Sequence, residues 1–335
     1  MIGAVRRALA RFKIDPYILA ILAILATVVF ASLVPARGQA AEVVGIATKI
    51  GVALVFFLHG AKLSPQAVVA GIAHWRLHLV VLATTFALFP LAGLAASGLP
   101  GWIVPAALVP GLIYLGCLPS TIQSAVGFTA VARGNVAAAV CGASASNILG
   151  VLITPLLVGV LLSAEGGGLS WGAFEAILLQ LLAPFIAGQI LRPWIGGFIQ
   201  RHAKQASLAD RGSILLVVYN AFSGAVAVGI WSQVSMGDLV RLSLICLVLL
   251  AASTAWTIWI SRRLKFPVED EITILFGGSN KSLAAGAPMA AVLFPAATVG
   301  FVLLPIMLYH QFQLMACAAI AGHYAKRADG PSETS

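Results

Sequence analysis

The chain has 335 residues, of which 60% are hydrophobic and only 9% are charged, and its formal net charge at pH 7 is +9. Because soluble domains carry roughly 25% charged residues, this composition argues against a soluble enzyme, a nucleic-acid-binding protein and a disordered chain. It predicts an all-α polytopic membrane protein.

Ten apolar stretches follow one another along the chain. Each approaches the roughly 20 residues that a helix needs to cross the bilayer, and they are residues 16–34, 42–60, 77–97, 102–118, 135–161, 173–192, 212–231, 238–260, 270–294 and 298–323. A short apolar piece, 119–131, follows the fourth stretch without a soluble linker. The first stretch follows basic residues as a signal peptide would, but it is long enough to span, so we expect it to be retained. The pattern predicts ten transmembrane helices.

The basic residues predict the orientation of these helices. With the N-terminus in the cytoplasm, most of the 20 Lys and Arg residues fall in cytoplasmic segments, as the positive-inside rule requires. The 7 Trp residues lie at or near the ends of predicted spans, where an aromatic belt forms. We therefore expect a multi-pass protein of the inner membrane with both termini cytoplasmic, whose basic residues contact anionic lipid.

Ten helices divide into two halves of five, and an odd number of crossings inverts the second half relative to the first. The chain is thus predicted to be a single transporter domain, 1–335, with a first repeat at 16–161, a second repeat at 173–323 and a polar C-terminal tail at 324–335. Secondary transporters of this kind place the substrate site near the middle of the membrane, where discontinuous helices meet.

Two stretches at equivalent places in the two halves carry helix-breaking and polar residues. The segment from Gly116 to Ala125 contains Pro119 followed by hydroxyl and amide side chains, and the segment from Phe276 to Ala284 contains two Gly followed by Ser, Asn, Lys and Ser. Unwound backbone inside a bilayer must line a cavity or be buried in protein. Close helix packing through small residues is the alternative, but two symmetric occurrences favour a binding site.

The candidate substrate-binding residues lie in and around these breaks: Thr121, Gln123, Asn147, Ser279, Asn280, Lys281, Ser282 and His310. Lys281 is the most informative, because it lies inside its stretch and a buried charged amine costs a few kcal/mol or more. It is expected to face an anionic substrate or to titrate during proton coupling, and a neutral or carbonyl-bound structural lysine is the alternative. Asn147 can line the site or bond a neighbouring helix, and His310 can relay protons or pack as a core residue.

Weaker signals come from Lys49, Asn220, Ser223 and the four Cys residues. Lys49 is close enough to the start of its stretch to extend toward the membrane surface. Asn220 and Ser223 can line the site or bond between helices. The four Cys lack the spacing of metal ligands, so we expect them to be small buried apolar residues and expect no metal site.

At these positions the sequence resembles the bile acid:sodium symporter family, and within it the divergent SBF-like branch. The resemblance is carried by Phe57-Leu58-His59-Gly60 through Pro65, Leu118-Pro119-Ser120-Thr121 with Ala132-Arg133-Gly134-Asn135, Ile153-Thr154-Pro155, and Gly278-Ser279-Asn280-Lys281-Ser282. It implies ten helices in two inverted repeats, a panel domain and a core domain, and broken fourth and ninth helices that cross. It also implies transport of organic anions such as bile acids, steroid conjugates or small carboxylates, usually with sodium.

One feature of typical family members is missing. They carry a glutamate in the second break that bridges two sodium ions, whereas Phe276 or Gly277 stands there in this chain and Lys281 follows. A sodium ion beside a fixed ammonium and without a carboxylate is electrostatically disfavoured, so we expect Lys281 to occupy the place of one cation. Hard cations accept neutral oxygens, and the candidate ion ligands are Ser120, Thr121, Gln123, Ser124 and Asn135.

The function predicted from these features is secondary active transport of a small organic anion by alternating access, with Na+ or H+ as candidate coupling ion and no other cofactor. The expected partners are membrane lipid and that anion, and no nucleic acid. The sequence has no HExxH motif and no pair of intramembrane acids, so we expect no enzyme. The alternative is a membrane regulator or sensor of ion homeostasis without rapid flux, and of calcium in particular, since the branch has eukaryotic relatives linked to calcium handling.

Overall fold

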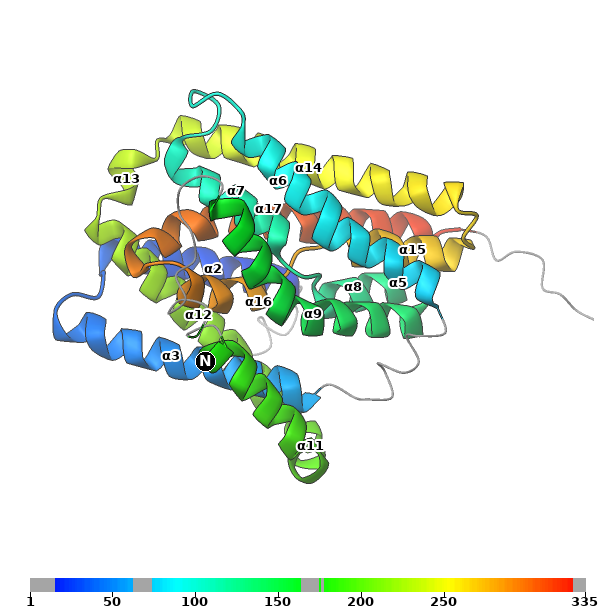
Figure 1. Ribbon diagram of the computed structural model, residues 1–335, viewed down its shortest axis with the longest axis horizontal. Coiled ribbons are helices and arrows are strands. Elements are labelled where there is room, and N and C mark those ends of the chain that lie inside the picture. Colours follow the sequence, from blue (N-terminus) through cyan, green and yellow to red (C-terminus); the bar gives the residue numbers. More distant parts are fainter. Residues whose placement is uncertain (1–15, 63–73, 164–174, 176–177, 328–335) are drawn as a thin grey trace, which may run out of the picture.

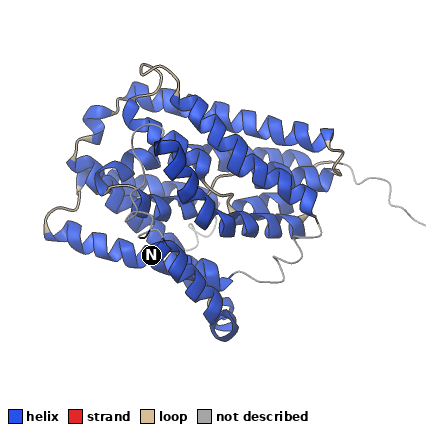
Figure 2. Ribbon diagram, in the orientation of Figure 1, coloured by secondary structure: helices blue, strands red, loops and turns tan. Residues whose placement is uncertain are grey.

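The computed structural model describes residues 16–62, 74–163, 175 and 178–327. In this part of the chain the regular elements are all helices, with no strand, as Figure 2 shows. The prediction of an all-α protein is therefore confirmed.

The helices of the first half follow the predicted stretches. They are α2 (Pro16–Leu33), α3 (Gln39–Lys62), α5 (Trp75–Ala83), η1 (Thr84–Leu88), α6 (Phe89–Ser97), η2 (Ala106–Leu108), α7 (Val109–Cys117), α8 (Ile122–Val131) and α9 (Val136–Ser163). The segment η1 is a π-helical turn that joins α5 and α6, and η2 is a single 3-10 turn before α7. The apolar piece predicted at 119–131 forms α8.

The second half is also helical throughout its described residues. Its elements are η3 (Leu178–Leu182), α11 (Ala183–Arg201), α12 (Ala203–Ala227), α13 (Ile230–Gln233), α14 (Met236–Arg263), α15 (Val268–Ser279), α16 (Leu283–Leu293) and α17 (Ala296–Ala325). α14 begins at a capping box, in which Ser235 accepts from the Asp238 N–H and Asp238 accepts from the Ser235 N–H, so two backbone donors of the helix start are satisfied. The tail predicted from residue 324 starts later, because α17 continues to Ala325; residues 328–335 lie outside the described part.

Among the described residues, five helices are long and apolar enough to cross a membrane. They are α3, the continuous helix Trp75–Ser97, α9, α14 and α17, and a sixth span results if the pair Ala106–Cys117 and Ile122–Val131, which is bent by 58°, is counted as one. The other predicted stretches coincide with α2, η3–α11, α12 and α15–α16, which are shorter or more polar. The chain is thus a multi-pass membrane protein.

The helices form two groups. The first, which we call the panel group, consists of α2, α3, α11 and α12, and α3 packs against both α11 and α12 at one side of the molecule in Figure 1. The second, the core group, consists of α5–α9 and α14–α17. α17 lies at the centre of the core group, since 61% of its apolar segment is buried inside the molecule. α14 lies at an edge of the group, with 22% of its apolar segment buried. The two groups meet where α12 contacts α16 and α17.

A charged cluster ties one end of the core group together. Glu271 is buried near the start of α15 and accepts two hydrogen bonds from the Arg262 guanidinium, at 2.9 and 3.2 Å, and one from the Tyr324 hydroxyl, at 2.6 Å. These bonds join α14, α15 and α17. Because the acceptor is ionised and the pairing is bidentate, they belong to the stronger class of hydrogen bond.

Replacing Glu271 by Gln is expected to lower the free energy of unfolding by about 1–3 kcal/mol, because one buried partner of a charged pair loses its charge. Glu269→Gln is the matched control: it lies two residues earlier, its side chain is 49% exposed, and it pairs with Arg327 at 2.9 Å. Exposed pairs contribute about 0–1 kcal/mol. Thermal unfolding of both variants in detergent checks the difference, and equal shifts would contradict it.

Candidate functional site

Two interrupted helices meet at the centre of the core group. The first interruption separates α7 from α8 at residues 118–121, and the second separates α15 from α16 at residues 280–282. Ser282 donates its backbone N–H to the Pro119 carbonyl at 3.0 Å, and the Thr121 hydroxyl donates to the Lys281 carbonyl at 2.8 Å. We call residues 116–124 and 279–283 the crossover. The two interruptions thus lie in the two segments that the sequence marks with helix-breaking residues, and they are hydrogen-bonded to each other.

The carbonyls of residues 116 to 120, at the first break, are all bonded. Each carbonyl from residue 116 to residue 120 accepts from another segment: Gly116 and Leu118 from Lys281 Nζ, Cys117 from Thr154 Oγ1, Pro119 from Ser282 N, and Ser120 from Asn147 Nδ2. A freed carbonyl inside a bilayer costs several kcal/mol unless it is satisfied within the protein. The break is therefore stabilised by α9 and by the second break together.

The second break is held by α17. Gln313 accepts from the Lys281 N–H at 2.8 Å and donates to the Lys281 carbonyl at 2.9 Å, so one amide side chain satisfies both backbone groups of that residue. The Tyr309 hydroxyl donates to the Ser279 carbonyl at 2.7 Å. Tyr309 was not predicted as a site residue, although it lies one helical turn before Gln313 and hence on the same face of α17.

The Lys281 side chain is the most constrained polar group of the crossover. It is fully buried, and its Nζ donates to the carbonyls of Thr85, Gly116 and Leu118 at 2.9, 2.8 and 2.8 Å. The Phe89 ring lies beneath it, with the ring centroid 4.1 Å from Nζ, a cation–π geometry. Three carbonyl acceptors require three N–H donors, which an ammonium has and a neutral amine lacks.

The expectation that Lys281 faces an anionic substrate or titrates during proton coupling stays a prediction. In this conformation its amine contacts carbonyls instead, as in the alternative of a carbonyl-bound lysine.

The Thr85 carbonyl has no donor within its own helix, because a π-helical turn is followed directly by a proline. The Phe89 N–H donates to the Thr84 carbonyl, one residue further back than in an α-helix. The next residue, Pro90, has no N–H with which to reach the Thr85 carbonyl. The helix thus presents one unpaired carbonyl to Lys281, and the signal for it is the proline inside the stretch 77–97.

Some of the remaining predicted site residues lie at the crossover and others do not. Asn280 donates to Ser124 Oγ at 3.3 Å, and Ser282 caps α16 by accepting from the Ala285 N–H. His310 is half-buried, with Nδ1 2.9 Å from Gln313 Nε2 and 3.4 Å from the Lys281 carbonyl. Asn280, Ser282 and His310 therefore lie close together at the crossover.

Asn135 lies outside the crossover, and Gln123 lies within it but is not buried there. Asn135 accepts from the Ala138 N–H and donates to Asp270, so it caps the start of α9, which is a structural use of an Asn side chain. Gln123 is exposed on α8. Both were expected as ion ligands, and Gln123 also as a substrate ligand, from their proximity to the break along the chain.

The oxygens left at the crossover are neutral. Ser120 Oγ, one of the predicted ion ligands, is buried without a hydrogen-bond partner among the described residues. In the described part of the chain, no group of three or more His, Cys, Asp or Glu side chains is placed so that it could hold a metal ion. The chemistry of the crossover is thus that of a fixed ammonium surrounded by carbonyl and hydroxyl oxygens.

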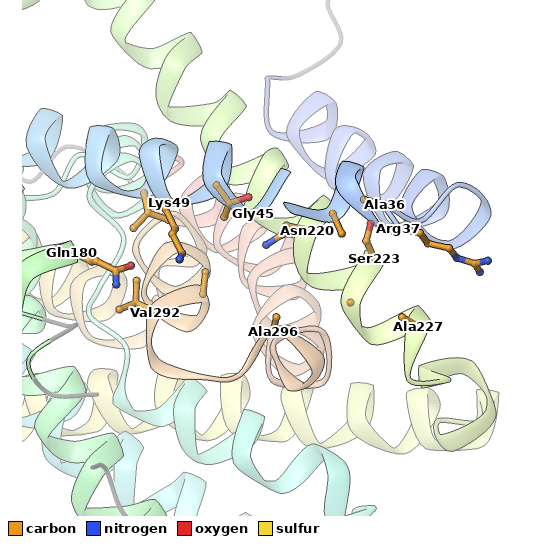
Figure 3. Close-up of a pocket in the computed structure, with 16 residues that line it drawn as sticks. Ala36, Arg37, Gly45, Lys49, Gln180, Asn220, Ser223, Ala227, Val292 and Ala296 are labelled. Carbon is orange, nitrogen blue, oxygen red and sulfur yellow. The ribbon is translucent and has the colours of Figure 1, made fainter. Parts of the chain in front are cut away.

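A separate cavity of about 480 Å³ lies between α3, α12 and α16. Figure 3 shows Lys49 extending from α3 toward Val292, with Gln180 pointing to the same space, while the guanidinium of Arg37 points away. Asn220 and Ser223 line the cavity from α12. Lys49 therefore does not extend toward the membrane surface as expected, and Gln180 was not singled out from the sequence.

Comparison with known proteins gives a family and several relatives. The family model described as "SBF-like CPA transporter family" matches residues 19–326. A protein of Pseudomonas aeruginosa, "Uncharacterized protein PA2026", is 53% identical over 309 residues, which cover 92% of this chain and 93% of that protein. "Putative symporter YfeH" of Escherichia coli is 46% identical over 316 residues, or 94% of each chain. "Sodium/bile acid cotransporter 7" of Rattus norvegicus is 26% identical over 280 residues, or 79% of each chain.

Proposed function

The chain belongs to the SBF-like CPA transporter family, and on this premise we propose that it is a secondary active transporter that moves a small organic anion by alternating access. The observation that carries the proposal is the crossover, where two broken helices bond to each other at Pro119 and Ser282. Broken helices that meet inside the bilayer are the usual substrate and ion machinery of secondary transporters.

The proposed architecture has ten spans in two inverted repeats, 16–161 and 173–323, in the inner membrane with both termini cytoplasmic. It is supported by the two interruptions, which occur in the fourth stretch of each half, and by the basic residues, most of which fall on one side in this orientation.

Alternating access would involve the panel group and the core group as moving bodies. The panel group is held together by the packing of α3 on α11 and α12 and of α12 on α2, and the core group is held together by the hydrogen bonds of the crossover. Relative motion of such packed groups exposes a site between them to each side in turn.

Lys281 is proposed to act as a tethered cation. Its ammonium lies among three carbonyl oxygens at 2.8–2.9 Å, and carbonyls are ligands that hard cations accept. A fixed positive charge at this point disfavours a second cation close by. We therefore expect transport to depend less on a sodium gradient than in relatives that carry a glutamate in the second break.

Uptake into proteoliposomes tests the proposal. With labelled cholate as probe, the wild-type protein is expected to give saturable uptake that persists when the sodium gradient is replaced by choline and a proton gradient is imposed. Strong sodium dependence, together with unchanged uptake by Lys281→Ala, would overturn the role given to Lys281. Ligand-induced stabilisation without any flux would instead favour the alternative of a membrane regulator or sensor of ion homeostasis.

A further inference from the structure

We infer that the C-terminal end of α14 binds one anionic phospholipid. Its phosphate is held by the guanidinium groups of Arg262 and Arg263, and one of its acyl chains lies in a hollow beside Trp259. The inference does not depend on the proposed transport function. In the proposed orientation of the chain, this end of α14 lies at the cytoplasmic leaflet.

α14 presents most of its surface to the bilayer. Only 22% of its apolar segment is buried inside the molecule, and Figure 1 shows the helix along an edge of the core group. Between Arg241 and Arg262 it carries no charged residue. At about 1.5 Å per residue this stretch rises about 30 Å, which is the thickness of the hydrocarbon core. Arg262 and Arg263 therefore lie at the level of the lipid headgroups.

An open hollow of about 540 Å³ lies on the exposed face of this helix end. It is lined by Ala255, Ile258, Trp259, Arg262 and Arg263, whose spacing places them on one face of α14. The small side chain of Ala255 leaves space beside the bulky indole of Trp259, which is 51% exposed. The end of the hollow toward the middle of the membrane is apolar and the end toward the helix terminus is basic, which is the arrangement that a phospholipid requires.

The apolar end of the hollow continues along the helix. Val248 and Leu244, about two and three helical turns before Ala255, are 66% and 57% exposed, and Ala251 between them and the hollow is also exposed. An acyl chain can therefore lie on this face from Trp259 toward the middle of the bilayer. A free phosphate ion would use none of this surface, so the shape favours a lipid.

The Arg263 guanidinium is available for a phosphate. Its Cζ lies 5.9 Å from the centroid of the Trp259 ring, a cation–π contact, and the Trp259 ring in turn contacts the Trp256 ring with centroids 5.2 Å apart. Among the described residues the guanidinium has neither an ion pair nor a hydrogen bond. The ring contact thus orients the guanidinium and leaves its N–H donors unused.

Arg262 also has unused donors. It donates from Nε and Nη2 to Glu271, while its Nη1 has no partner in the described part of the chain, and its side chain is 67% exposed despite the pair. A guanidinium carries five N–H donors in one plane, so it can bond a carboxylate and a phosphate at the same time. A phosphate here would accept charge-assisted hydrogen bonds from two adjacent arginines.

The other charges at this helix end favour an anion. Arg76 of α5 donates to the Leu264 carbonyl at 3.3 Å, and Lys265 follows directly; both side chains are exposed, and neither has an acidic partner among the residues that the structure describes. Glu269 and Glu271, which follow in α15, are each already paired with an arginine. Basic clusters next to a membrane span attract anionic lipid.

Native mass spectrometry of the full-length, delipidated protein in detergent tests the inference by resolving each bound lipid. The probes are dioleoylphosphatidylglycerol, its zwitterionic counterpart dioleoylphosphatidylcholine, and glycerol 3-phosphate, which is a headgroup without acyl chains. We expect the first phosphatidylglycerol to bind at least about tenfold more tightly than the first phosphatidylcholine, and glycerol 3-phosphate not to displace it.

Two variants address the two parts of the site. Arg263→Gln is expected to weaken the first phosphatidylglycerol about tenfold, because a charge-assisted pair is lost, and to leave phosphatidylcholine binding unchanged. Ala255→Phe fills the hollow without changing any charge, and it should weaken phosphatidylglycerol a few fold or more.

Arg201→Gln is the matched control. Arg201 is also an exposed arginine in the last turn of a helix, but it lies on α11, outside the hollow, and donates to the Gly197 carbonyl of its own helix. Phosphatidylglycerol affinity should stay at the wild-type value in this variant. Thermal unfolding of each variant verifies that it is folded.

Three results would overturn the inference. Equal weakening in Arg263→Gln and Arg201→Gln would indicate diffuse attraction between a basic protein and anionic lipid. Displacement of phosphatidylglycerol by glycerol 3-phosphate would assign the arginines to a soluble phosphate compound. Unchanged phosphatidylglycerol binding in Ala255→Phe would place the acyl chain elsewhere and remove the hollow from the site.

Discussion

Replacing Lys281 by Met is expected to lower the free energy of unfolding by about 3–6 kcal/mol. The substitution keeps an unbranched apolar chain beside Phe89 but removes the ammonium, so the carbonyls of Thr85, Gly116 and Leu118 lose their partner. A buried acceptor left unpaired costs about 1–3 kcal/mol. A decrease of about 10 °C or more in the midpoint of thermal unfolding in detergent is the expected measurement.

A second variant distinguishes a purely structural role of Lys281 from its proposed role as a tethered cation. Lys281→Ala removes the side chain and leaves a space bordered by three carbonyl oxygens, which a sodium ion can enter. We expect its unfolding midpoint to rise when choline chloride is replaced by sodium chloride, since a ligand that binds only the folded state stabilises it by about 2.7 kcal/mol at 100 times its Kd. The wild-type protein and Lys281→Met should show no such sodium-specific rise. A sodium effect of equal size in all three proteins would contradict the tethered-cation proposal.

Replacing Gly188 by Ala is expected to be the most damaging change in the panel group. A Cβ at Gly188 would lie 2.1 Å from the Phe57 carbonyl oxygen, and a Cβ at Gly60 on the facing helix would lie 2.1 Å from the Phe185 carbonyl oxygen. The backbones of α3 and α11 are therefore in direct contact, which only glycine permits. Since backbone atoms cannot rotate away as a side chain can, the helices must separate, and we expect a loss of about 3 kcal/mol or more.

Gly197→Ala is the control for this prediction. It lies on the same helix, but a Cβ there meets nothing within 4 Å, so alanine should be neutral or stabilise the helix by up to about 1 kcal/mol. Yield of monodisperse protein and the unfolding midpoint are compared for the two variants. A Gly188→Ala protein as stable as Gly197→Ala would show that α3 and α11 are further apart than described.

The two breaks of the crossover could be predicted from the sequence because their signals are local. Pro119 lies in the first break, the Gly277–Gly278 pair shortly precedes the second, and helix propensity acts over a few residues. The same local signal marked Lys281 as a charge inside a span. It gave no information on what the charge contacts, and the substrate-facing interpretation that followed from the sequence is not what this conformation shows.

The errors at Asn135, Gln123 and Lys49 have a common physical cause. Each residue was interpreted by its distance along the chain from a motif or a span end. The direction of a side chain depends on helical phase and on the neighbouring helices, so Asn135 caps α9, Gln123 is exposed on α8 and Lys49 lines a cavity. Capping of α9 by Asn135 could have been recognised, since Asn is a favoured residue at a helix start.

The sequence by itself determined that this is a helical membrane protein, where its apolar stretches lie and where two of them are interrupted, because hydropathy and helix propensity are local properties. Only the tertiary structure decided which groups surround Lys281. Its partners Thr85 and Gly116 are 196 and 165 residues away along the chain, and Thr85 offers a free carbonyl only because a π-helical turn runs into Pro90. Hydrogen bonds between such distant segments depend on how the helices pack, which no local pattern specifies.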